Sequence, residues 1–154
     1  MNFAQGLLSA VAASDICSAY YRLCLEHPIR LDTASANAPA ASIVKAATGN
    51  LSLKKLVGPG TVLQLGSLPE SVSLNFIVQG CKSVETDFVV PYGNSIQRGT
   101  FAILCNAATS FAGDLLPNPP HPRPNFHSMD ELIEIFGKFN NLVRELAVVA
   151  SHWR

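Results

Sequence analysis

Two carboxylates stand close together in an apolar, alternating stretch of the sequence and are the first candidates for chemistry. Glu85 and Asp87 would share one face of a β-strand, about 7 Å apart. At that spacing they could act as a general acid and base, or as ligands of a hard cation such as Ca²⁺. The simpler interpretation, which we favour, is that both belong to the solvated face of an antiparallel strand.

The histidines and cysteines show no spacing that is typical of a metal or catalytic site. No His-x-His, His-Glu-x-x-His or Cys-x-x-Cys pattern occurs, so the sequence indicates no metal site and identifies no cofactor or catalytic residue. Cys81, beside Lys82 in a predicted turn, is the best candidate for a nucleophile, and His121 or His127 could reach a thiol in space. A plain turn cysteine remains the simpler alternative.

Two further short motifs could bind an anion. Gly58-Pro59-Gly60 has the composition of a phosphate-binding loop, but such loops follow a strand and open a helix. Here the order looks reversed, so we interpret the glycines as a turn. Arg98, near Tyr92 and Asn94, could hold the carboxylate or phosphate of a ligand, or it could pair with Asp87.

The residues that follow these glycines change to a period of two, which predicts strands. Short strands are expected at Thr61–Leu65, Val72–Gln79 and Val84–Val90, with turns between them. Thr100–Cys105 is apolar on both faces, which we interpret as a central strand. Strands joined by such short connections predict an antiparallel meander of four to five strands.

An N-terminal helix is predicted to position this sheet from one side. It should run from Asn2 to about Glu26 and end at His27-Pro28, because a residue before proline avoids the helical region. Its charged edge is narrow, which indicates burial on most sides. Cys17 and Cys24 would lie roughly 10 Å apart along it, too far for a disulfide, so reduced and mostly buried thiols are expected.

A long C-terminal helix is the best-determined element of the sequence. Ser128 and Glu131 have the spacing of a capping box at its start. Apolar residues then recur at alternating steps of four and three, which indicates a continuous seam facing the sheet, a partner helix or both. The seam consists of Leu132, Phe136, Phe139, Val143, Leu146, Ala150 and Trp153.

The connecting segments are less regular. Asp32–Ser42 is interpreted as a loop, and Ile43–Val57 is expected to hold a short helix. Pro117–Pro124 contains five prolines and should be extended, so it could carry the chain across one face of the sheet. A docking peptide for an aromatic groove is the alternative, but a structural connector fits the position of its single arginine better.

The composition limits the partners that this chain can have. Charged residues make up 14% of it, against about 25% in ordinary soluble domains, and hydrophobic residues 48%. We therefore expect a homo-oligomer that covers part of the apolar surface. The formal net charge is zero, which argues against binding to nucleic acid or an acidic membrane. No run of about 20 apolar residues could span a membrane, and a cytoplasmic location is expected.

We thus predict one α+β domain over residues 1–154. The favoured function is a non-catalytic module that binds or senses a small molecule as a homodimer, with an apolar pocket between the sheet and the C-terminal helix. A small lyase, isomerase or hydrolase with acid–base groups in a sheet cavity is one alternative, and a structural subunit or adaptor is another. The candidate ligand-binding residues are Phe76, Phe88, Tyr92, Arg98, Phe101, Phe136 and Phe139.

Overall fold

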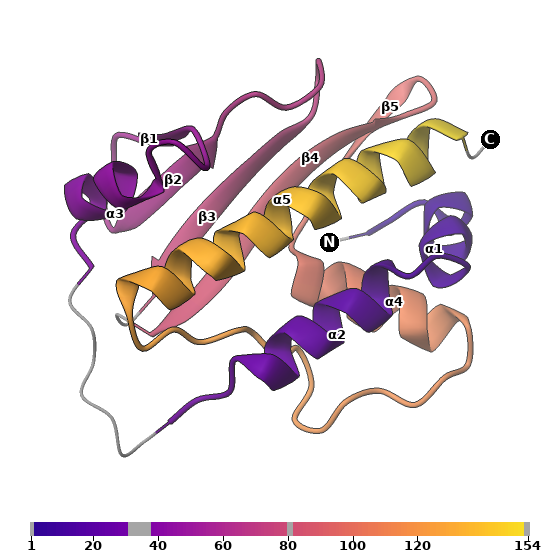
Figure 1. The fold of residues 1–154 in the computed structure, drawn as a ribbon. Helices are drawn as coiled ribbons and strands as arrows, with labels where there is room; N and C mark the ends of the chain where they lie inside the picture. Colours follow the sequence, from indigo (N-terminus) through magenta and orange to yellow (C-terminus); the bar gives the residue numbers. More distant parts are fainter. Residues whose placement is uncertain (1, 31–37, 80–81, 153–154) are drawn as a thin grey trace.

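The computed structural model describes residues 2–30, 38–79 and 82–152, and the predictions made for Cys81 and Trp153 lie outside them. The described chain forms ten elements (Figure 1). In chain order they are α1 Gln5–Ala12, α2 Ile16–Glu26, α3 Ala40–Ala47, β1 Leu53–Lys55, β2 Thr61–Leu65, β3 Ser73–Gln79, β4 Ser83–Tyr92, β5 Ser95–Gly99, α4 Phe101–Phe111 and α5 Met129–His152.

The five strands form one antiparallel sheet in the order β1-β2-β3-β4-β5, so each strand pairs with its neighbour in the chain. Leu63 lies opposite Phe76, and Phe76 lies opposite Thr86, which aligns one face of three strands. Leu63 and Phe76 are fully buried. The predicted fold class, an α+β fold with an antiparallel meander and a long C-terminal helix, is confirmed.

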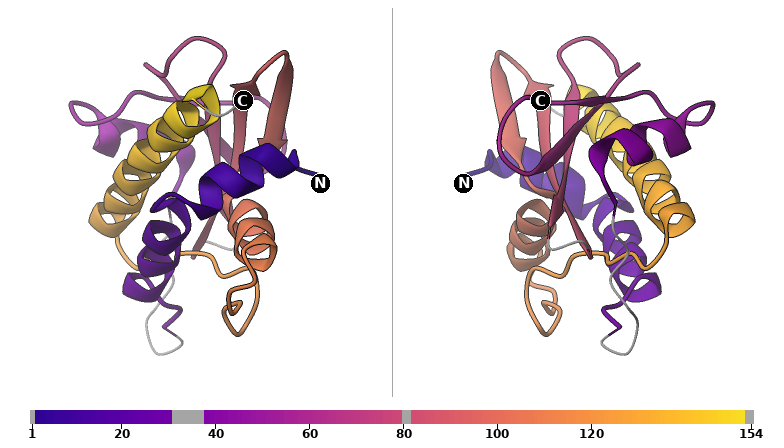
Figure 2. Two further views of the ribbon diagram at one scale, coloured as in Figure 1. Left: turned by 90° about the vertical axis from the view of Figure 1, so that its right-hand side faces the viewer. Right: turned by 90° about the vertical axis from the view of Figure 1, so that its left-hand side faces the viewer.

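The long helix α5 lies along one face of the sheet, with α2 beside it on the same side (Figures 1 and 2). Its seam faces the core, because Leu132, Phe136, Phe139, Val143, Leu146 and Ala150 are all buried. The side chains buried between the helices and the sheet form a single hydrophobic cluster. The predicted capping box at the start of α5 is half formed: the Glu131 backbone N–H donates to Ser128 Oγ at 3.1 Å, but the Glu131 carboxylate accepts from the backbone N–H of His127 instead of Ser128.

The predicted N-terminal helix is in fact two helices, α1 and α2. The break falls at Ala13–Asp15, where the Ser14 hydroxyl donates to the carbonyl of Val11 at 2.7 Å. The same Ser14 oxygen accepts from the backbone N–H of Ile16 at 3.2 Å. A serine side chain that bonds the backbone in this way competes with helical hydrogen bonds, which explains the interruption.

The prediction of a central strand at Thr100–Cys105 is wrong. Thr100 is the N-cap of α4, and its Oγ1 accepts from the backbone N–H of Ile103 at 3.0 Å. The Phe101 N–H donates to Thr86 Oγ1 at 3.2 Å, so a strand residue holds the same helix end. An apolar run buried on several sides looks the same in a helix and in a strand. The fifth strand is Ser95–Gly99 instead.

The middle of the chain also differs from expectation. The short helix α3 begins at Ala40, inside the segment interpreted as a loop, and Leu53–Lys55 is a strand. Gly58-Pro59-Gly60 therefore connects two strands. Gly58 and Gly60 have φ angles of 135° and 75°, a region that only glycine adopts easily, so the turn needs them for its backbone shape.

Candidate functional site

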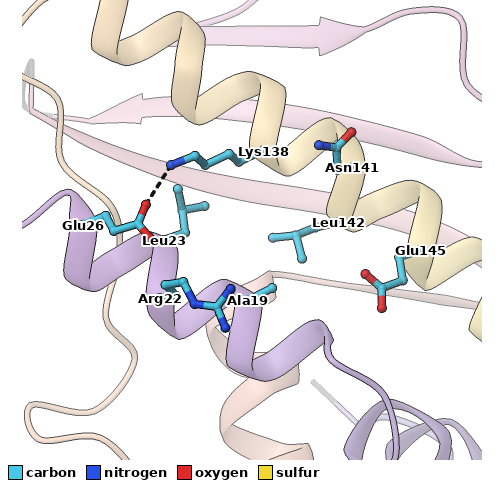
Figure 3. A pocket seen from close by; sticks show the side chains of 8 residues that line it. All are labelled: Ala19, Arg22, Leu23, Glu26, Lys138, Asn141, Leu142 and Glu145. Atoms are coloured by element: carbon cyan, nitrogen blue, oxygen red, sulfur yellow. Dashed lines mark hydrogen bonds and ion pairs between the residues drawn. The ribbon is translucent and has the colours of Figure 1, made fainter.

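A surface groove runs between α2 and α5, which lie side by side with their chains in opposite directions (Figure 3). Each helix supplies residues at spacings of three and four, so each presents a single face to the groove. The groove has a volume of about 240 Å³. It is lined by Ala19, Arg22, Leu23 and Glu26 of α2 and by Lys138, Asn141, Leu142 and Glu145 of α5.

The charges of the groove are only partly neutralised within the chain. Lys138 Nζ lies 2.9 Å from Glu26 Oε2 and 3.3 Å from Glu134 Oε1. The hydrogen bond from Lys138 lowers the pKa of Glu26, and the one to Glu26 raises the pKa of Lys138. Arg22 and Glu145 have opposite charges, yet neither forms a hydrogen bond or ion pair with another residue that the structure describes.

Each of these helices also carries one exposed aliphatic side chain that is not part of the groove lining. Leu25 follows Arg22 by three residues on α2, and Val148 follows Glu145 by three residues on α5. Their exposed fractions are 81% and 55%, which is high for aliphatic side chains. The groove itself combines apolar side chains, such as Leu23 and Leu142, with charged side chains from both helices. Arg22 and Glu26 belong to the narrow charged edge of the predicted N-terminal helix. The sequence does not show that α5 lies beside this edge, because the two helices are far apart in the chain.

Five of the predicted ligand-binding residues come together, but as a closely packed core. The ring centroids of Phe76 and Phe136 are 4.0 Å apart and stacked, and Phe139 lies 6.0 Å from Phe76. Phe101 lies 5.2 Å from Phe88 and 5.7 Å from Phe139. All five side chains are at most 1% exposed, so their rings fill the space between sheet and helix with one another.

The other two predicted residues are not among these buried rings. Arg98 is exposed on β5, and its guanidinium donates two hydrogen bonds to Asp87, at 3.1 and 2.8 Å. Pairing of Arg98 with Asp87 was the predicted alternative to the binding of a ligand carboxylate or phosphate by Arg98. Tyr92 is half-buried at the β4–β5 turn, in a hollow that it shares with Ala150 and Ser151 at the end of α5. Neither Tyr92 nor Arg98 therefore lies among the packed phenylalanine rings, although Tyr92 packs against the outside of the same hydrophobic core.

Glu85 and Asp87 are bound by different arginines. Glu85 Oε2 accepts from Arg123 Nε, and Glu85 is buried rather than solvated, with 8% of its surface exposed. Arg123 belongs to the proline-rich segment. That segment passes over α2, where the Tyr20 hydroxyl donates to the Pro122 carbonyl at 2.6 Å, and it then forms an antiparallel bridge to the start of β4.

A buried cluster of two histidines around one carboxylate joins the end of α2 to the start of α5. Glu131 Oε2 lies 2.7 Å from His27 Nδ1, and Glu131 Oε1 lies 3.0 Å from His127 Nδ1. The backbone N–H of His127 also donates to Glu131 Oε1 at 2.6 Å. Burial raises the pKa of Glu131, but hydrogen bonds from both histidines outweigh it and leave this pKa below its usual value.

The described thiols differ in reactivity. Burial raises the pKa of Cys24 to about 12 and that of Cys105 well above its usual value, which makes both poor nucleophiles. The pKa of Cys17 is lowered, chiefly by a hydrogen bond with Cys105. No group of three histidine, cysteine or acidic side chains within the described ranges could hold a metal ion. The predicted encounter of Cys81 with a histidine lies outside those ranges.

Comparison with known proteins adds no assignment: no family model, curated protein or solved structure matches this chain. Among the described helices, none combines the length and the apolar character that crossing a bilayer requires.

Proposed function

We propose that this protein is a non-catalytic interaction module that forms a homodimer through the groove between α2 and α5. The observation that carries this proposal is the pair of opposite charges on either side of an apolar floor, Arg22 and Glu145, neither of which forms a hydrogen bond or ion pair with another described residue. A partner surface with the reverse arrangement would neutralise both charges.

The size of the groove favours a protein partner over a small molecule. Pockets for drug-sized ligands usually enclose roughly 300–1,000 Å³ and bury most of the ligand. The groove holds about 240 Å³ and lies at the surface, with Arg22, Glu26 and Asn141 exposed beside it. Two helix faces with small apolar side chains between charged rims instead resemble the helix-in-groove mode of protein recognition.

The charges favour a second copy as that protein. Within one chain, the faces of α2 and α5 already complement each other, as the ion pair between Glu26 and Lys138 shows. A twofold axis along the groove would place α2 of one copy over α5 of the other, and so repeat this complementarity between chains. Arg22 would then meet the partner's Glu145, and by symmetry Glu145 would meet the partner's Arg22.

The interface should be small, and its affinity modest. Stable protein interfaces bury about 800 Å² on each partner, whereas α2 is only about 16 Å long. We therefore expect a concentration-dependent equilibrium between monomer and dimer, at the weak end of the micromolar to picomolar range of protein affinities. Salt should weaken it, because the pairing charges lie at the surface, with Arg22 exposed and Glu145 half-buried.

Charge reversal tests this arrangement directly. Arg22→Glu and Glu145→Arg should each weaken self-association by at least about tenfold, because each variant places like charges opposite each other. Sedimentation velocity over a series of protein concentrations measures this. A mixture of the two single variants should form a heterodimer, since both contacts across the twofold axis would then be between opposite charges. The double variant Arg22→Glu/Glu145→Arg should recover the homodimer.

Lys54→Glu provides a matched control, because Lys54 is an exposed lysine on β1, outside the groove. It should leave the dimer unchanged. A wild-type protein that stays monomeric at every concentration up to the millimolar range would overturn the proposal. So would a dimer on which neither charge reversal has an effect.

The contacts of the other candidate residues support a non-catalytic role. Each carboxylate of β4 is held by an arginine, and the thiols of Cys24 and Cys105 are poor nucleophiles. Binding of an apolar ligand by the phenylalanine cluster stays a prediction. It would require the stacked rings of Phe76 and Phe136 to separate.

A further inference from the structure

Gly137 lies inside the long helix α5, at a position where the described chain shows no need for a glycine. Its φ angle lies outside the left-handed region, so other residues could adopt the same backbone conformation. A Cβ atom added to it would meet no described atom within 4 Å beyond the adjacent backbone of the helix. Glycine destabilises the interior of a helix relative to alanine, because it loses more backbone freedom on folding. The packing within one chain therefore does not explain the missing side chain.

The missing side chain contributes to a surface hollow of about 440 Å³ beside α5. The hollow and the groove share Lys138 and Asn141, so the two adjoin along this helix. The groove lies on the α2 side of α5, whereas the hollow lies on the side of the connection between α3 and β1, which supplies Leu51. Leu51 and Ile133 are half-buried apolar side chains of its lining. A cavity of about 150 Å³ already takes up benzene, so the hollow has room for one aliphatic side chain.

The ion pair between Glu26 and Lys138 shows which residues of α2 and α5 lie at the same level along the groove. Rotation about a twofold axis along the groove keeps each residue at its level and carries α2 of the second copy over α5 of the first. Leu25 precedes Glu26 and Gly137 precedes Lys138, so these two neighbours also come to about the same level. Neither residue lines the groove, and the rotation places the outer flank of α2 over the outer flank of α5.

We propose that Leu25 of the second copy inserts into the hollow over Gly137, and that by symmetry each chain both gives and receives this leucine. The inference rests on the proposed homodimer and names the contact that fixes its register. Leu25 is 81% exposed in the single chain, and contact with Leu51 and Ile133 would remove its apolar surface from water. A larger side chain at position 137 would fill the space that this contact needs, which accounts for the glycine.

Changes of side-chain size at the two positions test the inference, with sedimentation velocity over a series of protein concentrations as the measurement. Gly137→Leu fills the hollow and should weaken self-association by at least about tenfold. Leu25→Ala should weaken it by about tenfold, because most of the inserted apolar surface is lost. The double variant Gly137→Leu/Leu25→Ala should associate more tightly than Gly137→Leu alone, because the smaller side chain of the partner makes room for the larger one.

The stability of the single chain provides a second measurement with the opposite sign. Gly137→Ala should raise the midpoint of urea unfolding at concentrations where the protein is monomeric, because alanine favours the helix and its methyl group has open space. A lower midpoint would show that the fold itself needs the glycine, and would overturn the inference. Leu25 is exposed, so Leu25→Ala keeps the association test available if Gly137→Leu does not fold.

Leu115→Ala is the matched control for Leu25→Ala. Leu115 is 96% exposed, follows α4 in the chain and lines neither the groove nor the hollow, so its truncation should leave self-association unchanged. If charge reversal at Arg22 or Glu145 weakens the dimer but neither Gly137→Leu nor Leu25→Ala does, the inference is overturned and the dimer through the groove stands. A wild-type chain that stays monomeric overturns both.

Discussion

His27 and Glu131 are 104 positions apart in the chain, yet the ring Nδ1 of the histidine lies 2.7 Å from the carboxylate Oε2. Through this contact the residue that ends α2 is bonded to the first turn of α5. The second oxygen of Glu131 holds the segment before α5, through both the ring and the backbone of His127. One carboxylate therefore fixes three parts of the chain.

Glu131→Gln should lower the free energy of unfolding by about 1–3 kcal/mol at pH 7, because an amide cannot accept these hydrogen bonds as strongly as a carboxylate. Since the pKa of Glu131 is lower in the folded state, its contribution is fully present above the unfolded pKa and is lost as the pH falls through the folded pKa. The gap between variant and wild type should therefore close in acid. Urea unfolding from pH 7 to pH 3 measures this.

The control for that experiment is Glu134→Gln, one turn further along α5, where the carboxylate is 57% exposed and contacts Lys138. Its loss should cost about 0.3–0.5 kcal/mol. Equal losses for Glu131→Gln and Glu134→Gln would contradict the role assigned to the buried cluster.

Removal of Arg123 should be far more damaging than removal of Arg98, although each arginine binds one carboxylate of β4. Arg123→Ala leaves the buried Glu85 without its cation, and an unpaired buried charge costs several kcal/mol. Arg98→Ala affects Asp87 at an exposed pair and should change stability little. Thermal unfolding of both variants tests this, and the opposite order of stability would show that the proline-rich segment does not rely on Glu85.

Truncation of the stacked ring of Phe136 should cost about 3–5 kcal/mol, the usual loss for a buried aromatic side chain. Val148→Ala, at an exposed position of the same helix, should change stability by less than about 0.5 kcal/mol. Guanidinium unfolding of both variants measures the difference. A mild effect of Phe136→Ala would indicate that the core around Phe76 is loosely packed.

The parts of the fold that could be predicted are those in which one face of an element is buried. The seam of α5 and the alternation of β3 and β4 were readable because burial repeats at the period of the helix or the strand. Thr100–Cys105 was predicted as a strand because its apolar residues lie on all sides of the element. The spacing of its apolar residues therefore does not distinguish a helix from a strand. The helix begins at the N-cap Thr100, whose side chain accepts from the Ile103 N–H. A single threonine in the sequence does not show whether it will form this hydrogen bond.

The candidate sites were harder to predict, because each depends on residues that meet only in the folded chain. Arg22 and Glu145 belong to helices that lie far apart in the sequence, and His27 meets Glu131 across 104 positions of the chain. The spacing of residues within one segment of the sequence does not predict contacts between such distant residues. The phenylalanines predicted to bind a ligand are among the largest apolar side chains of the chain. Such side chains are more often part of the hydrophobic core than of a binding site, and here they are buried.

The contacts that link α2 with α5 and with the proline-rich segment have a consequence for how the protein is made. Lys138 bonds Glu26, and Tyr20 bonds Pro122, so the first helices find their partners only near the other end of the described chain. A nascent chain would expose the apolar face of its sheet until α5 has left the ribosome. Contacts of such long sequence separation also slow folding. We therefore expect the protein to depend on chaperones during synthesis more than its size suggests.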